Sequence, residues 1–190
     1  KTLDLKNNYY LININPNYFE SILLRELPIE AVKISRYILP PRMNIQVLER
    51  EPFALATRRG LEGVENGAID LNGFWIEVGN PENANLSIKT KIVVNGWLEN
   101  NQKSIAKILQ SREQLGTSLE KIIINSNGDI NLETKEFQNI QIGANPKILE
   151  LQIRTLPYLI KSLQEKFIKD TKTIINLKDP TKPKLIRPNS

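Results

Sequence analysis

The sequence contains no cysteine and no histidine among its 190 residues. The absence of cysteine excludes disulfides, thiol nucleophiles and the usual zinc sites. The absence of histidine removes the side chain best suited to proton transfer near neutral pH. Carboxylates could still carry acid–base chemistry, so both absences disfavour an enzyme without excluding one. We therefore predict a protein without enzymatic activity, cofactor or bound metal.

Long hydrophobic runs and glycine-rich loops are missing as well. No stretch approaches the ~20 apolar residues that a membrane-spanning helix needs, and no secretory signal pattern is visible. No segment matches the dinucleotide-binding or phosphate-loop patterns. Since the chain begins with Lys1-Thr2-Leu3 and lacks an initiator Met, we expect it to be a piece of a longer protein.

Acidic residues are scarce only at the C-terminal end. Residues 161–190 hold eight Lys or Arg and three acids, which accounts for the whole net charge of +5. Such an end could attract an anionic lipid, an anionic polymer or an acidic partner, or it could be a solvated terminal segment. Nucleic-acid binding is disfavoured, because Phe167 is the only aromatic residue between these cations and falls on an apolar helix face.

Periodicity in the first third of the chain predicts a helix followed by a β-hairpin. Asn15-Pro16 is typical of a helix start, and Pro28 ends the helical run. The segments 31–36 and 43–48 alternate between apolar and polar residues on either side of a proline turn.

The remainder predicts short strands and two longer helices. A polar junction at 57–67 precedes two short strands around Asn72-Gly73, a strand at 86–94 and a helix at 101–115. A three-stranded meander at 121–125, 130–134 and 138–142 leads to a helix kinked at Pro157. A last strand spans 171–177, and prolines then end regular structure. This order predicts an α+β fold with a mostly antiparallel sheet.

The last predicted strand is a candidate binding surface. A strand added late to a sheet can lie at its edge, where its backbone can pair with a strand of a partner. Alternatively it closes the sheet, with Lys172, Lys178 and the prolines protecting the edge. At an edge, the substitution Ile175→Pro would abolish partner binding and leave the fold cooperative.

The segment LPIEAVKISRYILPPRMNIQVLEREPFALAT resembles the second half of the POTRA domain in FtsQ/DivIB cell-division proteins. It shows the family's apolar LP, strand, proline turn, return strand and ERxP in order. GAIDLNGFWI looks like the family's short hairpin, and the later helices, meander and final strand follow the family's order to the end.

This resemblance implies a partial POTRA domain at 1–57, made of a helix and a β-hairpin. A mostly antiparallel β domain with two helices follows at 58–178, and a proline- and lysine-rich tail at 179–190. The first POTRA strand and most of the first helix are missing, with Lys1–Leu5 as the expected tail of that helix. The POTRA sheet should therefore have an open edge.

The resemblance also implies a function without catalysis. Proteins of this family are single-pass membrane proteins with their bulk outside the cytoplasm, and they are enriched at the division septum. They bridge divisome partners such as FtsB and FtsL toward the septal peptidoglycan synthase. The family's last strand receives a strand from FtsB, and this points to Thr173, Ile174, Ile175, Asn176 and Leu177 here.

By position on the POTRA hairpin, Arg36, Arg42 and Arg50 are further candidate contacts. The alternative is a POTRA-bearing component of an outer-membrane assembly or secretion system. A third possibility, a carboxylate-dependent hydrolase, needs a cleft holding two acids, and no such pair is singled out by the sequence.

Overall fold

The computed structural model describes residues 15–78, 88–166 and 173–186, with the side chains of 164–166 left undescribed. The chain divides into two compact units, Lys1–Glu51 and Pro52–Ser190. The domain boundary expected after residue 57 falls inside strand β3 (Ala54–Arg59). Because β3 pairs along its whole length with β4, it belongs to the second unit. The helix tail expected at Lys1–Leu5 lies outside the described residues.

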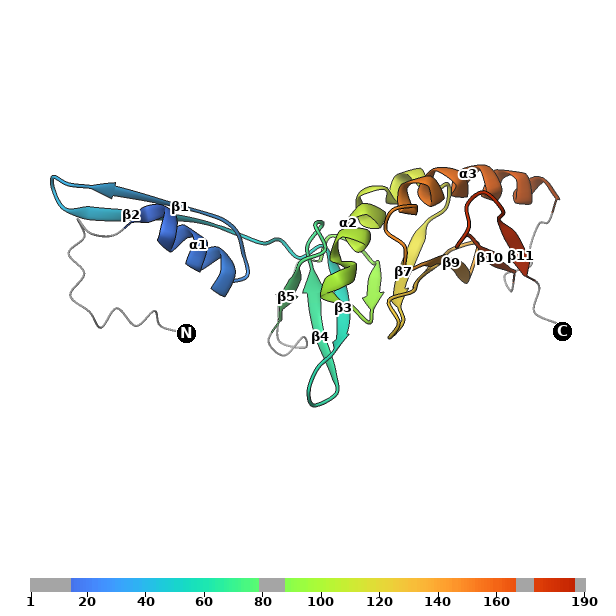
Figure 1. Ribbon diagram of the computed structural model, residues 1–190, viewed down its shortest axis with the longest axis horizontal. Helices are drawn as coiled ribbons and strands as arrows, with labels where there is room; N and C mark the ends of the chain where they lie inside the picture. The colour runs from blue at the N-terminus through green and yellow to red at the C-terminus, as the bar shows by residue number, and fades with distance from the viewer. Residues whose placement is uncertain (1–14, 79–87, 167–172, 187–190) are drawn as a thin grey trace. The chain divides into compact units, whose positions relative to one another are not determined.

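The described residues of the first unit form one helix and a two-stranded antiparallel sheet (Figure 1). Helix α1 (Pro16–Glu26) begins where the Asn15 side chain accepts a hydrogen bond from the Asn17 amide at 3.1 Å. Pro16 occupies the first helical position, where no backbone donor is needed. Strands β1 (Ile29–Tyr37) and β2 (Arg42–Glu49) form the hairpin that the alternating segments predict.

Among the described residues, the first unit has a small core. Leu23 of α1 packs with Ile29 and Ile34 of β1, and three partly buried side chains surround them: Phe19, Val32 and Met43.

The residues of the second unit that the structure describes form a nine-stranded sheet in the order β11-β10-β9-β8-β7-β6-β3-β4-β5. The strands besides β3 are β4 (Val64–Ile69), β5 (Trp75–Glu77), β6 (Val93–Asn95), β7 (Leu119–Ile124), β8 (Ile130–Thr134), β9 (Asn139–Gly143), β10 (Ile174–Asn176) and β11 (Lys184–Ile186). Most neighbours pair antiparallel, and β6 pairs parallel with both β3 and β7, as β10 does with β9. The predicted α+β class is confirmed.

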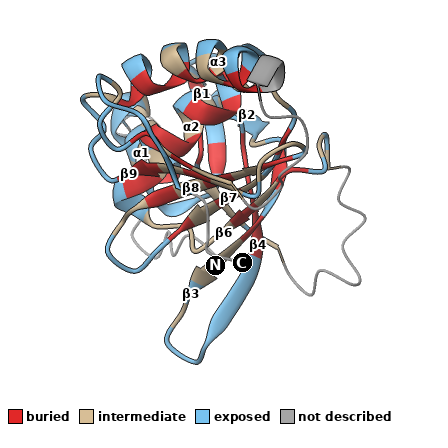
Figure 2. Cartoon of the chain, turned by 90° about the vertical axis from the view of Figure 1, so that its right-hand side faces the viewer, coloured by how far each residue is buried: buried red, intermediate tan, exposed pale blue. Residues whose placement is uncertain are grey.

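Two α-helices lie along one face of this sheet (Figure 1). They are α2 (Gln102–Gln110), with short 3-10 turns at Glu99–Asn101 and Arg112–Gln114, and α3 (Leu149–Lys166). Both these helices and the strands carry buried residues (Figure 2), which form one hydrophobic core. Helix α3 continues through Pro157, whose neighbour across the fold is Gly116. In the part of the chain that the structure describes, no helix is long and apolar enough to cross a membrane.

Two predicted segments differ from the structure. The polar junction at 57–67 is in fact part of the hairpin of β3 and β4, because Thr57, Arg58 and Arg59 pair antiparallel with Asn66, Glu65 and Val64. The strand expected at 86–94 is reduced to Val93–Asn95 among the described residues. In these segments, pairing with other strands determines which residues form a strand, and the local alternation of apolar and polar residues does not.

Candidate partner-binding surfaces

The predicted partner strand, Thr173–Leu177, contains β10, which lies inside the sheet. Strand β9 pairs with it in parallel on one side, and β11 pairs antiparallel on the other. Ile175 and Leu177 are both 0% exposed. The expected edge position of this strand is therefore wrong. Ile175→Pro would remove a backbone donor from an interior strand and disturb the core, so it does not separate binding from folding.

The edge is formed by β11, in a segment where the prolines predict no regular structure. This prediction is wrong because the prolines stand at the turn and before the strand, where a missing donor costs no ladder hydrogen bond. The Asp179 carboxylate accepts hydrogen bonds from the Thr181 amide and hydroxyl at 3.0 and 2.7 Å, and so shapes the turn. Two short apolar runs around this turn are a hairpin signal that could have located β11.

Strand β11 exposes all three of its residues. In the described part of the chain it pairs with β10 on one side only. Leu185 is 47% exposed and lies opposite Ile175, so the two side chains share the face of the sheet that holds the core. This edge offers backbone groups and a half-covered leucine to an incoming strand.

The edge hairpin is tied to the sheet by a buried amide. The Gln152 side chain is 0% exposed, and its Nε2 donates to the backbone oxygens of Ile142 and Leu177 at 2.7 and 2.8 Å. It therefore joins helix α3 to the strand end of β9 and to the residue that follows β10. The contact adds to the pairing of β9 with β10, through which β11 is held to the rest of the sheet.

Part of the basic end makes a local ion pair. Lys178 Nζ lies 2.6 Å from Asp129 Oδ2, and their hydrogen bond is the main reason that the pKa of Asp129 is lowered. The pKa of Asp179 is lowered too, chiefly by the hydrogen bond from the Thr181 side chain. Lys178 of this basic segment therefore stabilises the fold through its ion pair with Asp129.

The three candidate arginines of the first unit do not form one surface. Arg36 pairs with Met43, whereas Arg42 pairs with Tyr37 one position further along, so their side chains leave opposite faces of the hairpin. The Arg42 guanidinium stacks over the Tyr37 ring at 4.4 Å. Arg50 follows the other end of β2, ~26 Å from Arg42 along an extended strand.

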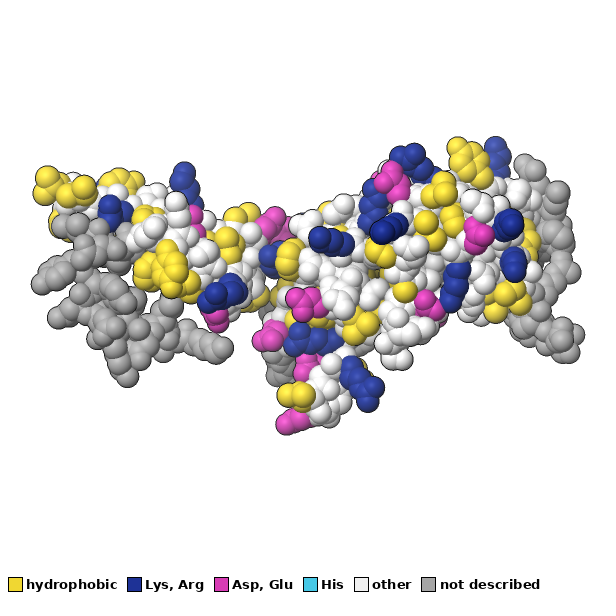
Figure 3. Space-filling view, in the orientation of Figure 1, with side chains coloured by type: hydrophobic (Ala, Val, Ile, Leu, Met, Phe, Trp, Pro, Cys, Tyr) yellow, Lys and Arg dark blue, Asp and Glu magenta, His cyan; other side chains and the backbone are white. Residues whose placement is uncertain are grey.

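Exposed apolar side chains mark the turns of two hairpins, a feature that the sequence patterns do not reveal. At the β1–β2 turn, where hydrophobic side chains gather in Figure 3, Ile38 and Leu39 are 63% and 89% exposed. At the β3–β4 turn, Leu61 and Val64 are 105% and 74% exposed. Scattered apolar residues on a surface are ordinary, so these turns define no site by themselves.

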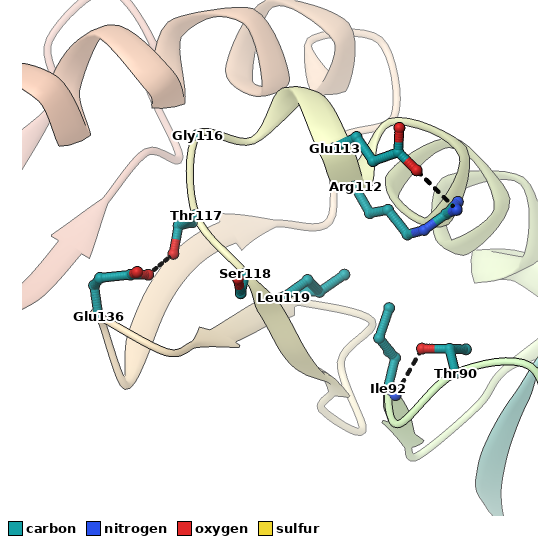
Figure 4. A pocket seen from close by; sticks show the side chains of 9 residues that line it. All are labelled: Thr90, Ile92, Arg112, Glu113, Gly116, Thr117, Ser118, Leu119 and Glu136. Atoms are coloured by element: carbon teal, nitrogen blue, oxygen red, sulfur yellow. Dashed lines mark hydrogen bonds and ion pairs between the residues drawn. The ribbon is translucent and has the colours of Figure 1, made fainter.

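A hollow of about 550 Å³ lies between the turn at Arg112–Gln114 and the start of β7 (Figure 4). Two carboxylates line it, and each is already engaged. Glu113 lies 3.1 Å from the Arg112 guanidinium, and Glu136 accepts a hydrogen bond from the Thr117 hydroxyl. The hollow therefore presents no pair of unengaged acids of the kind that a hydrolase would use.

The described residues contain no group of three or more potential metal ligands. No protein-family model matches the chain, and no curated protein matches it.

Proposed function

We propose that this chain is a non-enzymatic scaffold of the bacterial divisome, of the FtsQ/DivIB kind, that binds a partner by strand addition. The proposal rests on the ordered motifs that resemble this family and on the edge of the nine-stranded sheet. Its site is β11, Lys184–Ile186, rather than the interior strand at Thr173–Leu177.

The observation that carries the proposal is the one-sided pairing of β11 within the described residues. A partner strand laid beside β11 would satisfy its outward backbone groups and cover the exposed part of Leu185. Strand addition obtains affinity from the backbone and specificity from alternate side chains. It needs neither a deep pocket nor a catalytic group.

The partners of this proposal are divisome membrane proteins of the FtsB and FtsL kind, acting toward the septal peptidoglycan synthase. The scaffold would be anchored in the inner membrane by a single span outside this chain, with the two units on the extracytoplasmic side. Arg36, Arg42 and Arg50 remain candidate contacts of the first unit, as separate positions and not as one patch.

Depletion of the protein in the organism that encodes it tests the proposal. We expect depleted cells to elongate without dividing, and wild-type protein to restore division. Leu185→Arg, which places a charge on the half-covered edge, should fail to restore it. Leu61→Arg is the matched control, because it replaces an equally apolar and fully exposed leucine away from β11.

Circular dichroism and a thermal melt of both variants show whether the fold is kept. Normal division after depletion would contradict the divisome role. A failure of outer-membrane assembly or secretion without a division defect would favour the transport alternative. Full rescue by a folded Leu185→Arg variant would remove β11 as the binding edge.

A further inference from the structure

Helix α3 presents a regular line of exposed side chains on the side opposite its buried residues. The core side of the helix includes Ile153, Leu156 and Ile160. The exposed side chains follow one another at intervals of three and four residues, which keeps them on one helix face: Leu151, Arg154, Tyr158 and Lys161. We call these four residues the α3 stripe. Hydrophobic and basic side chains lie together along this helix in Figure 3.

The two apolar members of the α3 stripe are large and open to solvent. Leu151 is 48% exposed and Tyr158 is 77% exposed. They lie seven residues apart, so they stand two turns from each other on the same line of the helix. Covering such side chains is favourable, and tyrosine is enriched where proteins contact one another. Unlike the exposed residues at the hairpin turns, this pair has the repeat of a helix-packing surface.

The other two members of the stripe are cations with the same repeat. Arg154 and Lys161 are also seven residues apart, and they alternate with the apolar pair. Arg154 lies 2.6 Å from Glu150, but its side chain is still 73% exposed, so its remaining donors can bind a second carboxylate. The neighbouring helix α2 adds Lys107, which lies 3.8 Å from the same Glu150. Three cations thus surround this one carboxylate, and the surface favours an acidic partner.

We propose that the α3 stripe binds an acidic amphipathic helix of a partner protein. Two helices pack along a seam when their contact residues repeat every seven positions. A partner helix with apolar residues opposite Leu151 and Tyr158, and with carboxylates opposite the two cations, would match this repeat. The proposal does not depend on the divisome function, because the stripe lies on α3 and the proposed strand addition is at β11.

An anionic membrane surface is another occupant that a basic helix face with an exposed tyrosine could bind. The observations favour a helix for two reasons. The cations and apolar residues alternate with the repeat of a helix seam, which a fluid lipid surface does not require. A helix can also place its carboxylates opposite Arg154 and Lys161 and away from the exposed Glu150, whereas an anionic membrane presents charge to all three.

Fluorescence anisotropy with designed peptides tests the chemistry of the stripe. The probe is a labelled helical peptide with Leu opposite the apolar pair and Glu opposite the two cations, and the control peptide has Lys in place of each Glu. We expect the full chain to bind the acidic peptide about tenfold or more tightly than the basic one. Equal binding of the two peptides would overturn the proposal.

Two variants locate this preference on the chain. Arg154→Glu should remove it, because the substitution reverses the charge at the centre of the stripe. Arg59→Glu should keep it, since Arg59 is also exposed but lies on β3. Circular dichroism shows whether both variants are folded. A folded Arg154→Glu variant that still prefers the acidic peptide would contradict the assignment to α3.

Photo-cross-linking in cells tests whether a natural partner has this chemistry. Benzoylphenylalanine replaces Tyr158 of the full-length protein, or Arg59 in the control, and mass spectrometry identifies the cross-linked segment. We expect, at Tyr158 only, a segment with acidic and apolar residues at seven-residue spacing. A segment without this spacing, or no protein product above the control, would overturn the proposal. So would binding to phosphatidylglycerol vesicles without a preference for the acidic peptide, which would assign the stripe to a membrane surface.

Discussion

Among single residues, Gln152 has the clearest structural role. It is fully buried, and it supplies one donor to each of two backbone carbonyls, Ile142 and Leu177. Its own Oε1 accepts no hydrogen bond in the described part of the chain. The side chain therefore acts as a donor that holds α3, β9 and the end of β10 together.

We expect Gln152→Leu to lower the free energy of unfolding by about 2 kcal/mol, because it leaves buried carbonyl groups without a donor. Urea denaturation measures this change. Gln110→Leu is the control, since Gln110 is exposed and its hydrogen bonds of 3.3 and 3.4 Å are long. A loss at Gln152 no larger than at Gln110 would contradict the role of the buried amide.

The ion pair of Asp129 with Lys178 gives a pH dependence of stability. The folded-state pKa of Asp129 is lowered, so its contribution is present above the unfolded-state pKa and is lost as the pH falls through the folded-state value. The loss should begin below about pH 5. Since Lys178 is half exposed, the contribution is about 0.5 kcal/mol or less.

Denaturation of the wild type and of Asp129→Asn across this acidic range measures the effect. The two curves of unfolding free energy should converge as the pH falls. Asp179 also has a lowered pKa and titrates in the same range, so it remains in both proteins as a shared background. Parallel curves would show that the ion pair does not contribute.

On the scale of elements, the passage of α3 over the turn at Gly116 constrains the fold. Gly116 has a φ of +72°, and a Cβ atom there would lie 2.9 Å from the Pro157 Cβ. The turn before β7 thus needs a glycine both for its backbone conformation and for the approach of the proline-containing helix.

Gly116→Ala should therefore destabilise the chain by about 2–3 kcal/mol, through the left-handed conformation and the contact together. Gly128→Ala separates the two causes, because Gly128 has a similar φ of +84° and its nearest neighbour would be 3.6 Å away. We expect about 1 kcal/mol there. Equal losses in thermal denaturation would remove the Pro157 contact from the explanation.

Element positions were predictable where local signals are strong. The cap at Asn15-Pro16, the alternation in β1 and β2, and the turns of the meander locate α1 and five strands to within a few residues. Strand β11 was missed because its three residues acquire their conformation from pairing with β10. The parallel pairings of β6 could not be predicted either, since they join segments that are distant in the sequence.

The candidate site was predictable only in part, for the same reason. Sequence reasoning located the C-terminal strand region, but which strand forms the edge depends on whether the chain turns back after Asp179. Likewise, the three arginines share one hairpin in the sequence, and only the register shows that Arg36 and Arg42 leave opposite faces.

For the whole molecule, the difference between the two cores predicts unequal stability. The second unit contains a large continuous core, whereas the described residues of the first include three buried apolar residues. Hydrogen exchange followed by mass spectrometry should show β1 and β2 amides exchanging about tenfold or more faster than those of β7 and β8. Equal protection of both units would show that they unfold as one cooperative structure.

Fluorescence offers a companion observation on the same scale. Both tryptophans, Trp75 and Trp97, lie in the second unit, where their rings pack 5.6 Å apart. In a denaturant titration, their emission should therefore change only at the concentration at which the second unit unfolds. Circular dichroism should begin to change at a lower denaturant concentration, because it also detects the first unit.

We propose above that this chain belongs to the division machinery. The test is fluorescence microscopy of the full-length protein in dividing cells, with the tag at the N-terminus that the proposal places in the cytoplasm. We expect a band at midcell that appears with constriction. An even envelope signal without midcell enrichment would contradict it.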